Sequence, residues 1–385
     1  MRFLRCLYVI YLDNAATGGK KPPCVVNAVN YAICELCANP GHSGHQISVK
    51  AVEAVYDVRK KLRELIGAEY ENEVCFTQNC THAINIVLQG VLKNGDHVVI
   101  SSLEHNAVLR PLNYLKLNKD IEFDVAEVDL YNDEKTLGNI ESLIKSNTKL
   151  IFLTAASNVI GKRLPLRSVG ELCKSRNILF AVDGAQAAGV IPLDMCLLNI
   201  DYLCIAPHKG IYAPMGLGIL VSRKPIDNVL IAGGTGSDSM NPYQPDELPD
   251  RIESGTVNLP GIIGCGAGID FVRNIGIDNI HRYEMKLCAN LYNKLNKIGA
   301  ELYTPVPDIY SYVPLVSFNV KGYSSDEIGN LLSKEGIAVR SGLHCAPLAH
   351  GTIGTIERGT VRVSPSIYNT EEDVEKLIFI IKRLI

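Results

Sequence analysis

The stretch ILFAVDGAQ, residues 178–186, decides the fold class of this chain. An almost continuous apolar run ends at Asp183, and Gly184 and Gln186 follow directly. Such a run is typical of a strand that is buried on both faces, as in a parallel sheet. Ligands of these sheets bind beyond the carboxyl ends of the strands, so a carboxylate in this place can face a ligand. The alternative for Asp183 is a helix N-cap.

Six further runs of the same kind surround this stretch, and helical patterns lie between many of them, as at residues 81–92 and 166–176. The runs are EVCFT (73–77), HVVIS (97–101), FDVAEV (123–128), KLIFLTAAS (149–157), YLCIAP (202–207) and GLGILVS (216–222). Alternation of strands and helices predicts an α/β fold with a mostly parallel, seven-stranded sheet covered by helices.

The pattern changes after about residue 260, where a long helical stretch runs through residues 261–297. A capping box at Ser324 and Glu327 starts another helix. The remaining elements are strands at LVSFNV (315–320) and TVRVS (360–364) and a helix at NTEEDVEKLIFIIKRLI (369–385). We therefore expect a large domain at residues 14–260 and a smaller α+β domain at residues 261–385, joined by residues 1–13.

The composition is that of an ordinary globular protein, with 385 residues, 47% hydrophobic residues and a net charge of −3. This charge gives no reason to expect nucleic acid or a membrane surface as a partner. The 12 cysteines are scattered, which indicates reduced thiols and a cytoplasmic location. The start, MRFLRCLYVIYLDNAAT, predicts a strand because its apolar run is too short and interrupted for a signal peptide. No stretch approaches the ~18 apolar residues of a membrane span.

Polar residues follow several of the predicted strands. In TQNCTHAIN (77–85), Cys80 and Thr81 begin a helix, whose free N–H groups can hold an anion, although Thr81 could be only an N-cap. In APHKG (206–210), Lys209 follows a strand. A lysine shielded from water there can react as an amine, but a solvated lysine is commoner.

Two more polar residues complete the set. His105 in SSLEHNA (101–107) can stack on a ring or carry a proton, and Asn158 in TAASNVIG (154–161) can donate to a ring oxygen. A surface histidine and a turn asparagine are the alternatives. Together, an anion cradle, a histidine, an asparagine, an acid and a lysine are the inventory for pyridoxal 5′-phosphate (PLP).

The stretch VRSGLHCAPLAH (339–350) leaves the role of Cys345 open between nucleophile, structural thiol and metal ligand. Zinc could take Cys345 with His344 and His350, and Cys34 and Cys37 form a second candidate pair. One CxxC without a partner pair is weak evidence for a metal. We expect Cys34 and Cys37 to share the apolar face of a helix, and we predict no metal site.

The motifs as a set resemble one family. They are YLDNAAT (11–17), THAIN (81–85), EHNA (104–107), SNVIG (157–161), DGAQA (183–187), PHKG (207–210), ESGTVN (253–258) and RSGLHCAPLAH (340–350). The chain resembles the class V aminotransferase family of fold-type I PLP-dependent enzymes, and within it the SufS-like branch of cysteine desulfurases and selenocysteine lyases. The resemblance runs from residue 11 to residue 373.

The resemblance implies roles around the cofactor. Lys209 would form the Schiff base with PLP, with His208 beside it at the phosphate. Asp183 would pair with the pyridine nitrogen, Gln186 would bond the ring oxygen, and His105 would stack on the ring.

It also implies a phosphate site shared between subunits. Cys80 and Thr81 take the positions of the phosphate loop, and Thr256 would reach the phosphate of the neighbouring subunit, which implies a homodimer with shared active sites. Cys80 stands where relatives usually carry a hydroxyl residue, and Ala206 where they often carry a serine. A thiol is the poorer hydrogen-bond donor, so some phosphate contacts are expected to differ.

The reaction implied is that of a cysteine desulfurase. Arg362 would clamp the substrate carboxylate with help from Asn158, a bidentate task that suits guanidinium. Cys345 would take the sulfur of L-cysteine as a persulfide and pass it to a sulfur-acceptor protein, and Arg340 precedes its loop. The alternative is a selenocysteine lyase, another C–S lyase or an aminotransferase in which Cys345 is dispensable.

Overall fold

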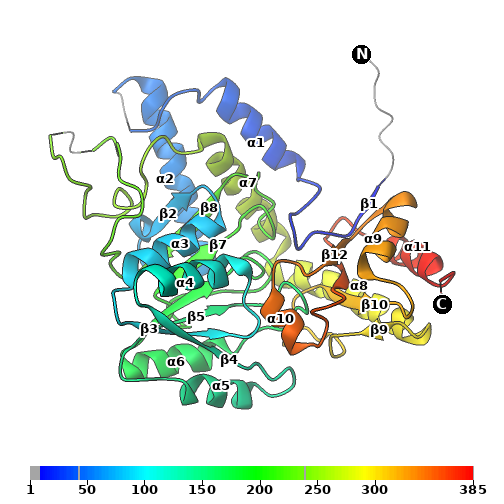
Figure 1. Ribbon diagram of the computed structural model, residues 1–385. Coiled ribbons are helices and arrows are strands. Elements are labelled where there is room, and N and C mark those ends of the chain that lie inside the picture. The colour runs from blue at the N-terminus through cyan, green and yellow to red at the C-terminus, as the bar shows by residue number, and fades with distance from the viewer. Residues whose placement is uncertain (1–8, 42–43, 238–239, 385) are drawn as a thin grey trace.

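The computed structural model describes residues 9–41, 44–237 and 240–384 (Figure 1). In this part of the chain the main sheet has seven strands in the order β2-β8-β7-β6-β5-β3-β4. They are β2 (Val74–Thr77), β3 (His97–Ser101), β4 (Glu122–Ala126), β5 (Thr148–Thr154), β6 (Leu179–Asp183), β7 (Tyr202–Ile205) and β8 (Gly218–Ser222). Only β8 runs antiparallel to its neighbours, β2 and β7. The predicted fold class is confirmed, with all seven strands where the apolar runs place them.

Helices cover both faces of this sheet. One face packs on α3 (Cys80–Val91) and α4 (Asn106–Asn118). The other packs on α2 (Gln46–Ile66), α5 (Asp133–Ser142), α6 (Leu166–Arg176) and α7 (Leu259–Ile275), and α1 (Pro23–Cys34) lies against α7. Successive strand residues point to opposite faces, so Val98 joins one apolar cluster and Val99 the other. Burial on both faces explains why the strands read as continuous apolar runs.

The C-terminal part forms a second, smaller sheet with its own apolar cluster (Figure 1). Its order is β12-β13-β10-β9, from β9 (Glu301–Leu302), β10 (Val316–Asn319), β12 (Arg340–Gly342) and β13 (Thr360–Val363). The helices are α8 (Ile277–Lys297), α9 (Ser325–Lys334), α10 (Pro347–Thr352) and α11 (Glu371–Ile381). The capping box of Ser324 and Glu327 at the start of α9 is confirmed.

The start of the described chain lies beside this C-terminal part. The strand β1 (Ile10–Tyr11) pairs in parallel with β11 (Ile337–Ala338), and Asp13 bridges Ser364. Residues 1–8 of the predicted first strand lie outside the described residues. The division of the chain into two domains stays a prediction.

The helical stretch predicted at residues 261–297 is confirmed. It consists of two helices, α7 and α8, because Gly276 between them has φ 90°, a conformation that interrupts a helix and that glycine adopts readily. One prediction about a helix is wrong. Cys34 and Cys37 do not share an apolar helix face, since α1 ends at Cys34, Cys37 lies beyond it and both thiols are exposed. Over the described residues, no helix is long and apolar enough to cross a membrane.

Candidate active site

A cavity at the carboxyl edge of the main sheet brings most of the predicted site residues together. Its empty space, including the part that is open to solvent, is about 570 Å³. Its walls come from the ends of β5, β6 and β7 and from the first turns of α3 and α4. The lining residues are Asn79, Cys80, Thr81, Ile84, His105, Ala107, Thr154, Asn158, Asp183, Ala185, Gln186, Ala206, His208 and Lys209.

Lys209 stands in this cavity with a free amine. The turn after β7 closes with a hydrogen bond from the Lys209 N–H to the Ala206 carbonyl at 3.1 Å. Nζ of Lys209 makes no hydrogen bond and no ion pair with any described residue. Burial lowers the pKa of Lys209 below its ordinary value, although the Asp183 carboxylate opposes this shift. Lys209 is therefore more available as a neutral amine than a solvated lysine.

Asp183 ends β6, with 4% of its surface exposed. Its Oδ1 accepts a hydrogen bond from the Ala185 N–H at 2.9 Å, and the Cys80 thiol donates to the same oxygen at 3.7 Å. Oδ2 has no hydrogen-bond partner among the described residues. Asp183 caps no helix, so the N-cap alternative is wrong, and one carboxylate oxygen remains for a ligand.

The start of α3 points at the same cavity. Asn79 is the N-cap, and its Oδ1 accepts from the His82 N–H at 2.9 Å, so Thr81 is not the cap. The first N–H groups of a helix lack partners inside the helix, and the helix dipole favours an anion beside them. Cys80 is turned toward Asp183, so its thiol serves the carboxylate in this structure.

His105 and His208 flank the cavity as neutral rings. His105 is the N-cap of α4, where its Nδ1 accepts from the Ala107 N–H at 3.0 Å, and burial lowers its pKa. His208 Nδ1 lies 3.0 Å from Thr17 Oγ1, and burial lowers its pKa to about 4. Gln186 donates from Nε2 to the Ala15 carbonyl at 2.9 Å. The first turns of the N-terminal segment thus support both Gln186 and His208.

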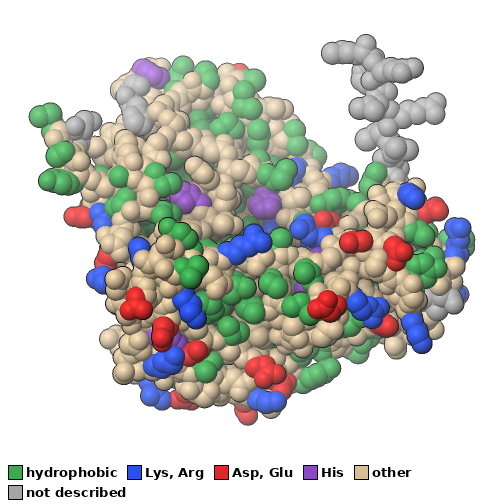
Figure 2. All heavy atoms as spheres, viewed as in Figure 1, with side chains coloured by type: hydrophobic (Ala, Val, Ile, Leu, Met, Phe, Trp, Pro, Cys, Tyr) green, Lys and Arg blue, Asp and Glu red, His purple; other side chains and the backbone are tan. Residues whose placement is uncertain are grey.

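Cys345 lies at the mouth of the cavity and not in its wall. It is exposed and lines an outer groove with Asn85, Arg110 and Tyr114. The groove and the cavity share Thr81, His105 and Ala107, so the two spaces are neighbours. Figure 2 shows histidine and basic side chains gathered near the centre of the viewed face, with acidic side chains mostly around it.

The two histidines beside Cys345 are buried rather than turned to it. His344 Nε2 lies 3.0 Å from Thr360 Oγ1, and His350 Nδ1 lies 2.7 Å from Thr355 Oγ1. Burial lowers the pKa of His344 to about 2 and of His350 to about 4. Among the described residues, no three His, Cys, Asp or Glu side chains gather as a metal-binding group.

The arginine of the predicted carboxylate clamp, Arg362 on β13, sits opposite Arg340 on the neighbouring strand β12. Arg362 is 1% exposed, and its Nη1 donates to the Asn158 carbonyl at 2.8 Å. Its Nη2 forms an ion pair with Asp13 Oδ1 at 2.7 Å. Arg362 Nε and the Arg340 guanidinium make no hydrogen bond with the described residues. Donors are therefore left over for an anion.

Comparison with known proteins assigns the family. The family model for class V aminotransferases matches residues 10–377. The chain belongs to the class V aminotransferase family. This class V chain is 33% identical to a probable cysteine desulfurase of Pyrococcus abyssi, over 98% of this chain and 94% of the relative. It is 30% identical to a probable cysteine desulfurase of Synechocystis, over 95% of this chain and 89% of the relative.

Solved structures of cysteine desulfurases have the same fold as this class V chain. The apo cysteine desulfurase of Thermococcus onnurineus superposes with a TM-score of 0.90 at 32% identity, covering 98% of this chain and 94% of the other. A cysteine desulfurase of Escherichia coli gives a TM-score of 0.86 at 26% identity, with the same coverage. The predicted family is thus confirmed.

Four predicted site residues of this class V chain do not line the cavity, namely Thr256, Arg340, Cys345 and Arg362. Thr256 is exposed and accepts a hydrogen bond from Asn39 Nδ2 at 3.5 Å. It does not line the space around Lys209 within this chain.

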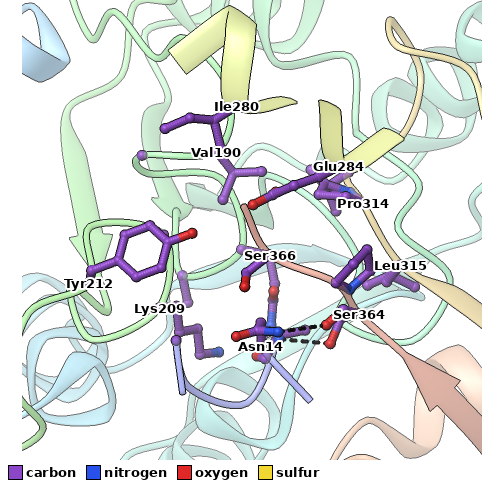
Figure 3. A pocket seen from close by; sticks show the side chains of 18 residues that line it. Asn14, Val190, Lys209, Tyr212, Ile280, Glu284, Pro314, Leu315, Ser364 and Ser366 are labelled. Carbon is purple, nitrogen blue, oxygen red and sulfur yellow. Dashed lines mark hydrogen bonds between the residues drawn. The ribbon is translucent and has the colours of Figure 1, made fainter. Parts of the chain in front are cut away.

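The sequence reasoning missed two carboxylates near the site. Asp13 lies just beyond the first strand, much as Asp183 lies at the end of β6, and that position could have indicated it. Glu284 on α8 is 5% exposed, and Figure 3 shows its side chain and that of Tyr212 pointing into a second hollow that Lys209 also lines. No local signal marks Glu284, because it lies inside a regular helical pattern.

Proposed function

We propose that this chain is a PLP-dependent cysteine desulfurase that converts L-cysteine to L-alanine and takes the sulfur on Cys345 as a persulfide. The observation that carries the proposal is the adjacency of two spaces. The cavity of Lys209 and Asp183 shares Thr81, His105 and Ala107 with the groove of Cys345. The names of the relatives support the same activity.

The residues of the cavity fit PLP. A phosphate suits the start of α3, the free Oδ2 of Asp183 suits a protonated pyridine nitrogen, and the unpaired amine of Lys209 suits the aldehyde. When bound, PLP supplies an electron sink for the charge that develops as a proton leaves the substrate's α-carbon. His105 would stack on the ring, and Gln186, held by the Ala15 carbonyl, would reach the ring oxygen.

Binding and proton transfer fall to the chain's own side chains. Arg362 and Arg340 present unpaired donors on neighbouring strands, which suits the substrate carboxylate, and Asn158 lies beside Arg362. Lys209 would take the α-proton on Nζ, because its lowered pKa makes the neutral amine available.

In the proposed transfer step, Cys345 accepts the sulfur atom of the substrate. The Cys345 thiolate attacks the substrate sulfur, so the S–S bond forms as the Cβ–S bond breaks. The electron pair of the broken bond returns to carbon, which takes up a proton and becomes the methyl group of L-alanine. The persulfide is then passed to a sulfur acceptor, for which the exposed groove of Cys345 gives access.

Two measurements test this function. The purified protein with PLP is expected to show visible absorbance from a lysine-bound cofactor, and Lys209→Ala to lose it. Cys345→Ala is expected to lose at least about 90% of alanine formation from L-cysteine, as expected when the nucleophile of a covalent step is removed. A colourless protein would contradict the PLP assignment. Full turnover of L-cysteine by Cys345→Ala would contradict the formation of a persulfide on Cys345.

A selenocysteine lyase is the second candidate, because Cys345 lines the outer groove and not the cavity wall. In that case Cys345→Ala would still release L-alanine from L-selenocysteine at the wild-type rate. Assays with L-cysteine, L-selenocysteine and cysteine sulfinate on both proteins separate the two functions.

We also propose a homodimer with shared active sites. Exposed apolar side chains lie on α1 and α2, and Val52 and Tyr56 line a hollow with Gly255 and Val257, the neighbours of Thr256. A second copy of the chain would cover this apolar surface and bring Thr256 to the partner's phosphate site.

Mixing two variants tests the sharing of sites. Lys209→Ala is expected to be inactive, and Thr256→Ala to be impaired at limiting PLP. Their heterodimer contains one site with both Lys209 and Thr256, so mixing the subunits is expected to restore activity. Lack of recovery in a verified heterodimer would contradict shared sites, and a monomer in sedimentation would contradict the dimer.

A further inference from the structure

Two consecutive residues hold a strained backbone in the loop between β12 and α10, residues 343–346, which we call the sulfur loop. His344 has φ 48° and Cys345 has φ 57°, and neither is a glycine. The left-handed region is unfavourable for a residue with a side chain, so neighbouring groups must stabilise it. Each carbonyl has one such anchor. Asn158 Nδ2 donates to the His344 carbonyl at 2.7 Å, and the Asn106 N–H donates to the Cys345 carbonyl at 2.7 Å.

Asn158 also contacts the arginine of the carboxylate clamp. Its own carbonyl accepts from Arg362 Nη1 at 2.8 Å, while Nη2 of the same guanidinium pairs with Asp13 at 2.7 Å. A continuous series of contacts thus runs from Asp13 through Arg362 and Asn158 to the backbone of His344. All four residues are buried or partly buried, so these contacts are weakly screened by water.

We propose that Asn158 couples the occupancy of the carboxylate clamp to the backbone of Cys345, with the substrate's carboxylate taking the unpaired Nε of Arg362 and replacing Asp13, the resident carboxylate, at Nη2. The inference rests on the proposed function, because it assigns the clamp to Arg362 and sulfur transfer to Cys345. In this coupling Asn158 is a positioning residue that acts through the loop.

The guanidinium explains how the coupling works. It is planar and rigid, so Nη2 cannot turn from Asp13 toward a new carboxylate without moving Nη1 and the Asn158 carbonyl. Asp13 itself is anchored elsewhere, since its backbone bridges Ser364 beside β13. A ligand carboxylate therefore shifts Asn158, and the Asn158 side chain shifts the anchor of His344 and Cys345. The clamp and the loop then have two linked arrangements.

The alkylation rate of Cys345 by iodoacetamide reports the coupling. It is measured on the PLP-loaded protein by mass spectrometry of the Cys345 peptide, because Cys24, Cys34, Cys37 and Cys196 are also exposed. L-Alanine at saturation is the probe, since it carries the carboxylate and the amine without sulfur. We expect it to change the wild-type rate about two- to tenfold, the range of one net hydrogen bond.

The Asn158→Ala variant tests the positioning role. It is expected to alkylate faster than wild type without L-alanine, because one anchor of the loop is gone, and to lose the response to L-alanine. Asp13→Asn keeps the shape of the side chain but removes the ion pair with Arg362. In this variant without L-alanine, Cys345 is therefore expected to be alkylated as fast as Cys345 of the wild type with L-alanine bound. Thr360→Val is the matched control, because it removes the partner of the His344 ring but leaves the contacts from Asp13 through Arg362 and Asn158 to His344 intact. It should keep the response.

The outcomes separate the inference from the proposed function. If bound L-alanine merely shields Cys345 from iodoacetamide, the alkylation rate of Asn158→Ala will still change when L-alanine is added. A change as large as that of the wild type would overturn the coupling. A wild-type rate that L-alanine does not change overturns it as well. The visible spectrum reports L-alanine binding independently, so absence of any spectral change means that the proposed function, and the coupling with it, fails. Full turnover of L-cysteine by Cys345→Ala would contradict only the role of Cys345 as the persulfide carrier.

Discussion

At the scale of the residue, burial sets the protonation of two groups on either side of one hollow. Lys209 and Glu284 both line this hollow, and Figure 3 shows their side chains. Burial lowers the pKa of Lys209 and raises the pKa of Glu284 to about 8, because the protein penalises the charged form of each. The acid and the base are thus both driven toward their neutral forms near neutral pH.

Glu284 predicts a pH dependence of stability. Its pKa in the folded protein is raised above the unfolded value, so its contribution to the free energy of unfolding is fully present below about pH 4.3 and is lost as the pH rises to about 8. The neutral isostere Glu284→Gln should flatten this loss. Urea unfolding of both proteins from pH 5 to pH 9 measures it, and parallel curves would contradict the prediction.

At the scale of the element, the start of α3 depends on a glycine in β8. A Cβ at Gly218 would lie 2.1 Å from the Asn79 carbonyl carbon and 2.5 Å from Thr77 Oγ1. No real Cβ contact is so short, so any side chain there must displace the turn between β2 and α3. This turn carries the candidate phosphate site, which ties a packing requirement of the sheet to cofactor binding.

Gly218→Ala is therefore expected to weaken PLP binding at least about tenfold, since a displacement of the helix start removes hydrogen bonds to the phosphate that are each worth about 1 kcal/mol or more. Titration of the visible absorbance with PLP measures the affinity. Gly138→Ala on α5 is the control, because a Cβ there has nothing within 4 Å and the exchange should stabilise the helix by about 0.5–1 kcal/mol. Unchanged PLP affinity in Gly218→Ala would contradict the assignment of the phosphate site.

At the scale of the whole molecule, the C-terminal part closes the site built on the main sheet. Asp13, Asn158 and Arg362 come from three distant parts of the chain and meet in a continuous series of contacts. The sulfur loop is anchored on the main-sheet side by Asn106 and Asn158. Burial lowers the pKa of His208 beside the main sheet and of His344 in the C-terminal part.

The acid side of the stability profile follows from these histidines. The pKa of His208 and of His350 is lowered to about 4, and that of His344 to about 2. Unfolded histidines bind protons below about pH 6.5, so stability should fall as the pH drops from about 6.5 toward 4. His350→Asn removes one of these groups and should make the fall shallower. Thermal unfolding at pH 6.5, 5.5 and 4.5 measures the slope, and equal slopes would contradict the prediction.

The sequence by itself determined the elements of the main sheet and pointed to two residues of the candidate site. Apolar runs without alternation specify strands buried on both faces, and Asp183 ends one of these runs while Lys209 lies two residues after another. Such signals are local, because the period of the side chains and the end of a strand are set within a few residues. The family motifs added the other site residues in the same local way.

Only the tertiary structure decided how these residues are connected. The pairing of Asp13 with Arg362, the anchoring of His344 by Asn158 and the burial of Glu284 join residues far apart in the chain. It also decided that Cys37 is exposed beyond α1 and that Gly276 separates α7 from α8. The physical reason is that hydrogen bonds, ion pairs and desolvation depend on which side chains the packed core brings within a few ångströms, and a one-dimensional pattern does not contain these distances.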